Sequence, residues 1–163
     1  MVLDPANTEL KPETEFLLFS ASRAQHVAEV IRPQLENGVV VLCDRFADSS
    51  YAYQGAGHGL ELETLQAITR FATGGLQPDL TVLFDLAIET GLERRQTSGG
   101  EWNRLDASAL EFHKRVRRRF LELAAAEPER WVVVDASRGI DEVEAEVMNI
   151  LDGRLPEKLV LSK

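Results

Sequence analysis

The sequence predicts an α/β fold with a parallel sheet, and three observations support this prediction. Helical patterns alternate with short apolar runs along the chain, each run is rich in β-branched residues, and each ends in a carboxylate. The runs cover 39–44, 80–85 and 131–135. An unbroken apolar run is typical of a strand buried on both faces, and its alternation with helices is typical of a parallel sheet.

Five segments are predicted to be helical, because their apolar residues recur at spacings of three and four. The first begins at Glu13 and ends at Asn37-Gly38, where glycine follows the apolar pattern. The polar stretches between helices are predicted to be loops, and no repeat or domain boundary is visible. We therefore expect one domain over 1–151 and a tail over 152–163. The other helices are predicted at 60–71, 88–95, 108–126 and 140–151, and the main loops at 46–59 and 96–103.

Composition narrows the class of protein. A chain of 163 residues with a net charge of −9 does not suit a protein that coats nucleic acid or an anionic membrane. No apolar run approaches the roughly 20 residues of a membrane span. Cys43 is the only cysteine, so an internal disulfide is excluded and a cytoplasmic location is expected. Most of the 18 basic residues are arginine, which suits phosphate binding, although a high-GC genome would enrich arginine equally.

Two groups of polar residues are candidates for a ligand site. Asp44-Arg45 follows an apolar run, at the sheet edge where α/β proteins bind ligands. The segment 44–55 adds hydroxyls, an amide and two tyrosines. Phe19 and Arg23 lie four residues apart and share a helix face, which suits a nucleobase. Taken singly, a surface arginine or a core phenylalanine is the better interpretation of each feature.

Three motifs, taken together and in order, resemble bacterial thymidylate kinase. They are LLFSASR at 17–23, DRF at 44–46 with SSYAYQG at 49–55, and PDLT at 78–81. The similarity runs from about residue 3 to about residue 151. It implies a three-layer α/β/α fold like that of P-loop nucleoside-monophosphate kinases. It also implies transfer of the γ-phosphoryl group of ATP to dTMP, giving dTDP, with Mg²⁺, and a homodimer.

The resemblance implies a role for each matched residue. Phe19 matches the residue that stacks on thymine, Arg23 the one that hydrogen-bonds the base, and Arg45 the one that holds the phosphate of dTMP. Glu15 belongs to a family pair with a mainly structural role. The remaining substrate-binding candidates are Ser49 and Ser50 beside the base and phosphate, Tyr53 near the sugar, and Gln54.

A lid over ATP is implied around residues 96–103, and we expect it to be the least ordered internal segment. Family lids carry arginines that stabilise charge on the transferring phosphoryl group. Asn103-Arg104-Leu105-Asp106 resembles the family's lid motif, and Arg94 also lies nearby. The resemblance therefore gives Arg45, Arg95 and Arg104 as the catalytic candidates.

The phosphate-binding loop that such a kinase needs is absent from these 163 residues. The motif G-x-x-x-x-G-K-[ST] cradles the ATP phosphates, and the sequence contains no Gly-Lys pair. The chain is therefore expected to be the C-terminal part of such a kinase, with the first two strands missing. The runs at 39–44 and 81–86 would then not be direct neighbours. Three hypotheses stay open: a thymidylate kinase, a non-catalytic dTMP-binding fragment, and an unrelated α/β interaction domain.

Overall fold

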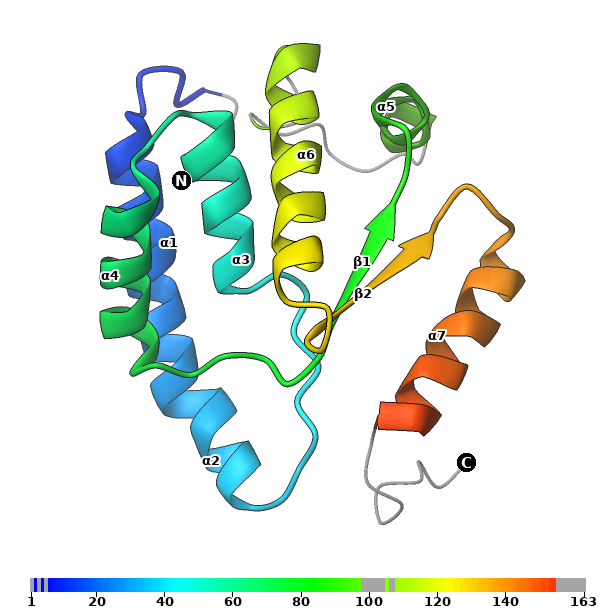
Figure 1. Cartoon of the computed structure of the whole chain (residues 1–163). Coiled ribbons are helices and arrows are strands. Elements are labelled where there is room, and N and C mark those ends of the chain that lie inside the picture. Colours follow the sequence, from blue (N-terminus) through cyan, green and yellow to red (C-terminus); the bar gives the residue numbers. More distant parts are fainter. Residues whose placement is uncertain (1, 3, 5, 98–104, 106–107, 155–163) are drawn as a thin grey trace.

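The computed structural model describes residues 2, 4, 6–97, 105 and 108–154. Within these residues the sheet has two strands, β1 (Thr81–Asp85) and β2 (Trp131–Asp135). They are parallel, with Thr81 beside Trp131 and Asp85 beside Asp135 (Figure 1). Two of the three predicted strands are thereby confirmed.

Helices cover both sides of the strands. α6 (Leu110–Ala126) packs on β1 and β2, and α7 (Ile140–Arg154) packs on β2 from the other side (Figure 1). α5 (Ile88–Thr97) follows β1. The predicted α/β class is confirmed, although α5 and α7 extend two and three residues beyond their predicted ends. No helix in the described part of the chain is long and apolar enough to cross a membrane.

A helical layer precedes β1 in the sequence. α1 (Pro12–His26) continues through the π-helical segment η1 (Val27–Ile31) into α2 (Arg32–Glu36). The helix ends where Gly38 adopts a φ of 74°, which glycine allows without strain. α4 (Leu62–Thr73) packs beside α1 (Figure 1). The predicted helix that begins at Glu13 and ends at Asn37-Gly38 is thus confirmed, with boundaries that agree within one residue.

The predicted loop at 46–59 is wrong, because most of it is helical. α3 (Ala47–Ser50) runs directly into the π-helical segment η2 (Tyr51–Gly57). Of the three glycines that suggested a loop, Gly55 and Gly57 instead allow close packing. A Cβ atom on Gly57 would lie 2.5 Å from Cε2 of Phe112, so only glycine fits between η2 and α6. π-Helical segments are rare and often occur at functional sites.

The strand predicted at 39–44 is also wrong. Residues 39–43 form no ladder, and Leu42 is 84% exposed. As expected, this segment does not pair with β1, whose described ladder partner is β2. Contrary to the prediction, the strands β1 and β2 are also not buried on both faces, because Phe84 of β1 and Val133 of β2 are exposed. Strand formation needs a hydrogen-bonding neighbour, and apolar content alone does not provide one.

The core holds η2 against α6, and α6 against β2. Ala52 of η2 packs with Phe112 and Val116 of α6. Further along α6, Leu123 and Ala124 pack on Trp131 of β2. These contacts fix η2 on α6, which itself packs on the sheet, and so give a rigid base to the side chains that η2 turns toward α1.

Candidate functional site

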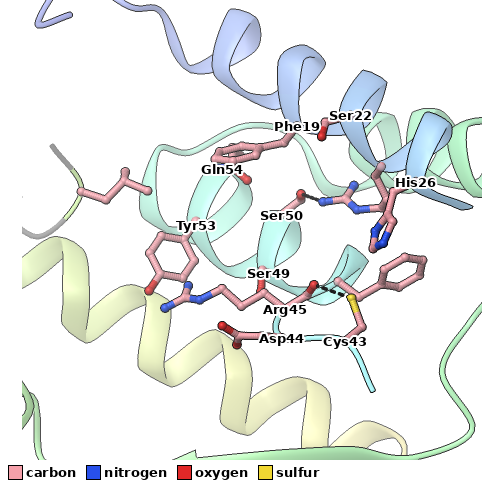
Figure 2. A pocket seen from close by; sticks show the side chains of 13 residues that line it. Phe19, Ser22, His26, Cys43, Asp44, Arg45, Ser49, Ser50, Tyr53 and Gln54 are labelled. Atoms are coloured by element: carbon pink, nitrogen blue, oxygen red, sulfur yellow. Dashed lines mark hydrogen bonds between the residues drawn. The ribbon is translucent and has the colours of Figure 1, made fainter. Parts of the chain in front are cut away.

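A cavity of about 320 Å³ lies between α1 and the helical segment α3–η2 (Figure 2). Three stretches of chain line it: one face of α1, the turn before α3, and the inner face of α3 and η2. Leu105 also lines the cavity. The lining residues of the three stretches are Phe19, Ser22, Arg23 and His26; Cys43, Asp44, Arg45 and Phe46; and Ser49, Ser50, Tyr53 and Gln54.

The α1 wall follows from helical periodicity. One face of α1 carries Phe19 and the residues three, four and seven positions after it, because such spacings lie on the same side of a helix. These residues are Ser22, Arg23 and His26. Figure 2 shows Phe19, Ser22 and His26 along this helix at the cavity. An aromatic ring and a guanidinium therefore lie one turn apart on the same wall.

Arg23 places a partly buried cation in this wall. Its Nη2 donates to Ser50 Oγ at 2.8 Å, and the guanidinium lies 5.8 Å from the centre of the Phe46 ring. Burial lowers the pKa of Arg23 from its usual value. Its buried Nη1 makes no hydrogen bond with any described residue. A buried donor without an acceptor is costly, and Arg23 lines the cavity, so a ligand carbonyl is a suitable partner for its guanidinium.

Arg45 adopts an unusual backbone conformation. Its φ is 64°, and it is the only residue other than glycine with a positive φ in the described part of the chain. Such a conformation costs energy and is often found at functional sites. The Arg45 guanidinium lies 5.0 Å from the centre of the Tyr53 ring (Figure 2). This turn therefore holds an exposed cation at the mouth of the cavity.

Two aromatic side chains of α6 hold the ring of Tyr53 in place. Its ring centre lies 6.0 Å from that of Phe112 and 6.2 Å from that of Phe120, both in edge-on geometry. Such pairs restrict the ring beyond the effect of burial alone. Tyr53 thus forms a rigid aromatic wall opposite α1.

Cys43 is a poor candidate for a nucleophile. Its Sγ donates to the Arg45 carbonyl oxygen at 3.3 Å. Burial, and then the nearby Asp44, raise the pKa of the Cys43 thiol. Because the thiolate is the reactive form, this cysteine contributes to the shape of the turn rather than to covalent chemistry.

The structure brings all seven predicted substrate-binding residues to one cavity: Phe19, Arg23, Arg45, Ser49, Ser50, Tyr53 and Gln54. Their roles toward a ligand stay predictions. Arg95 lies on α5 and does not line this cavity. Arg94 donates to the carbonyl oxygens of Ala136 and Ser137. Arg104 and the predicted lid residues 98–103 lie outside the described residues, whereas Gln96 and Thr97 belong to α5.

Sequence reasoning missed several lining residues. Ser22 and His26 could have been found, because they lie three and seven residues after Phe19 on a predicted helix. Phe46 and Cys43 carried no such signal, since their place depends on the turn at Arg45.

Comparison with known proteins decides the family. Residues 1–147 match the sequence profile described as "Thymidylate kinase". The chain belongs to the thymidylate kinase family. It is 58% identical over 147 residues to "Thymidylate kinase" of Deinococcus radiodurans, covering 90% of this chain and 70% of that protein. It is 50% identical over 163 residues to "Thymidylate kinase" of Roseiflexus sp., covering 93% and 72%.

A solved structure supports the same assignment. The crystal structure of thymidylate kinase from Ehrlichia chaffeensis matches with a TM-score of 0.71 and 27% sequence identity. The match covers 88% of this chain and 68% of that one. The family consists of nucleoside monophosphate kinases, so the predicted enzyme class and the P-loop kinase fold are confirmed. An unrelated interaction domain is excluded.

Proposed function

We propose that this chain forms the dTMP site of a thymidylate kinase, which transfers the γ-phosphoryl group of ATP to dTMP and gives dTDP. The convergence of the predicted residues on one cavity carries this proposal. Its volume of about 320 Å³ lies at the lower end of the roughly 300–1,000 Å³ of small-molecule pockets. A mononucleotide is of suitable size.

The α1 wall suits a thymine base. Phe19 offers a planar ring for stacking, which is a common way of holding a base. The free Nη1 donor of Arg23 suits a base carbonyl, and thymine carries one at C4. Ser50 fixes the guanidinium from the other side. This pairing supports recognition of a base with a carbonyl oxygen rather than an amino group at that position.

The turn before α3 suits the phosphate. Arg45 lies at the cavity mouth against the Tyr53 ring, and guanidinium groups bind phosphate oxygens in pairs. Tyr53 lines the same cavity beside Arg45, and its ring is the candidate contact for the sugar. The local cations explain how a chain with a net charge of −9 accepts an anionic ligand.

ATP and Mg²⁺ are implied by the family, but the residues present do not fit them. The described residues contain no group of three or more His, Cys, Asp or Glu side chains that could hold a metal ion. No Gly-Lys pair that would cradle the ATP phosphates occurs in the 163 residues.

This observation favours a second function for the chain assayed by itself, namely dTMP binding without phosphoryl transfer. Charge stabilisation of the phosphates is the main contribution of such enzymes. With ATP and dTMP present, we expect the 163-residue chain to bind dTMP and to form no measurable dTDP. Binding would be measured by calorimetry and turnover by a coupled assay.

The two readouts separate the hypotheses. Turnover at a normal enzymatic rate of about 1–100 per second would support the complete reaction and refute the binding-only function. Failure to bind dTMP at millimolar concentration would contradict both. Thymidine, which lacks the phosphate, is the matched ligand control, and we expect it to bind at least tenfold more weakly because it leaves Arg45 unused.

We further propose that the protein acts in the cytoplasm as a homodimer, with no nucleic-acid or membrane partner. Leu17 on α1 is 52% exposed and Phe71 on α4 is 90% exposed. Because α1 and α4 pack side by side, these side chains support an apolar contact surface between two copies.

A further inference from the structure

A buried carboxyl group lies behind the wall of the cavity. Glu15 of α1 is 1% exposed. Its Oε1 accepts a hydrogen bond of 2.6 Å from Nε2 of Gln54, a residue 39 positions away in the sequence. Gln54 itself is 2% exposed and lines the cavity (Figure 2). The two side chains thus join α1 to η2 at the base of the site.

This hydrogen bond decides which way the Gln54 amide faces. An ionised Glu15 only accepts hydrogen bonds, so in this form it selects the NH₂ end of the Gln54 amide. The carbonyl oxygen Oε1 must then point away from Glu15. No described residue donates a hydrogen bond to Gln54 Oε1. Gln54 lines the cavity, so this orientation leaves an acceptor available to a ligand there. The opposite orientation of the amide would leave a donor available instead.

His58 does not compete for the same carboxyl oxygen. Its Nε2 lies 3.6 Å from Glu15 Oε1, which is too long for a hydrogen bond. Burial, and then the cation Arg115, lower the pKa of His58. Arg115 is itself engaged with the carbonyl oxygens of Ala56 and Gly57. The histidine is therefore neutral near pH 7 and leaves the bond between Glu15 and Gln54 undisturbed.

Burying a carboxyl group is costly unless polar groups surround it. The residues around it point to a role in the site, because Gln54 connects Glu15 directly to the cavity.

We propose that Glu15 is a positioning residue that orients the Gln54 amide, so that the site selects a base carrying an N3–H donor. This inference rests on the proposed function, in which the cavity holds dTMP. Thymine has a donor at N3 and a carbonyl at C4, whereas cytosine has an acceptor at N3 and an amino group at C4. Gln54 Oε1 and Arg23 Nη1 match the thymine pattern and oppose the cytosine pattern.

The test compares dTMP and dCMP binding to the full 163-residue chain by calorimetry. Glu15→Gln can donate to Gln54 Oε1 and so allows the amide to turn. We expect the ratio of the dCMP to the dTMP dissociation constant to fall about tenfold in this variant, the usual effect of one misplaced hydrogen bond. In a Gln54→Ala background, the same change should alter the ratio less than about twofold, because the two residues act as one unit.

Glu13→Gln, an exposed change on the same helix, is the matched control and should leave the ratio unchanged. An unchanged ratio in Glu15→Gln, together with weaker dTMP binding in Gln54→Ala, would overturn the role of Glu15 and leave the proposed function intact. Failure of the unmodified chain to bind dTMP would overturn both.

A second measurement needs no variant at Glu15 and so does not depend on how that variant folds. In the unmodified chain, the side-chain amide protons of Gln54 should exchange with water at least tenfold more slowly than those of Gln66, which is exposed on α4. The Gln54 signal would be assigned by its loss in Gln54→Ala. Equal exchange rates for the two glutamines would overturn the proposal.

Discussion

Replacement of Asp48 by alanine is expected to destabilise the fold by about 3 kcal/mol, the lower end of the cost of breaking a buried ion pair. Asp48 Oδ1 and Oδ2 accept hydrogen bonds of 3.0 and 2.8 Å from Arg130. The two side chains are only 11% and 12% exposed. This pair ties α3 to the residue before β2, so its loss removes the more buried of the two carboxylates that contact Arg130. Urea unfolding measures the effect.

Glu127 provides the matched control, because it contacts the same guanidinium from the surface. Arg130 donates to its two carboxylate oxygens at 2.9 and 2.8 Å. Hydrogen bonds to Glu127, and then to Asp48, raise the pKa of Arg130. Since Glu127 is 43% exposed, we expect Glu127→Ala to cost less than about 1 kcal/mol. Equal losses in the two variants would contradict the view that burial makes the Asp48 pair important.

Replacement of Arg23 by methionine is expected to weaken dTMP binding roughly 10- to 150-fold. This range corresponds to the 1.5–3 kcal/mol of a hydrogen bond to a charged group. Methionine keeps most of the side-chain volume, so the cavity should keep its shape. The change also removes the buried Nη1 donor. We therefore expect binding to fall much more than stability does. Calorimetry and thermal unfolding of the same samples measure both quantities.

Arg70 is the control for this prediction, since it is exposed on α4 and does not line the cavity. Arg70→Met should leave the dTMP dissociation constant within about twofold of the unmodified value. If Arg23→Met bound dTMP as well as Arg70→Met does, the base would not lie against the α1 wall.

Periodic patterns explain what the sequence could predict. The helices have an apolar spacing that depends only on local geometry, and the structure reproduces them within a few residues. The strands β1 and β2 follow helical segments and contain unbroken apolar residues. On α1, the four-residue spacing of Phe19 and Arg23 was enough to place both on one wall of the cavity.

Other features depend on contacts that no local pattern contains. Residues 39–43 have the composition of a strand, but pairing needs a neighbour at hydrogen-bonding distance. Gly57 suggested a loop, yet it marks the close approach of Phe112. The positive φ of Arg45 and the bond between Glu15 and Gln54 are consequences of the tertiary fold. The structural role implied for Glu15 by family resemblance therefore left its link to the cavity unseen.

A crystal structure of this chain with dTMP would test the central claim most directly, namely that the cavity between α1 and η2 holds the nucleotide. We predict that the thymine ring stacks on Phe19 with its C4 carbonyl oxygen at Arg23 Nη1, and that the phosphate contacts Arg45. Density for dTMP outside this cavity, or inside it with the phosphate at Arg23 and the base at Arg45, would contradict the claim.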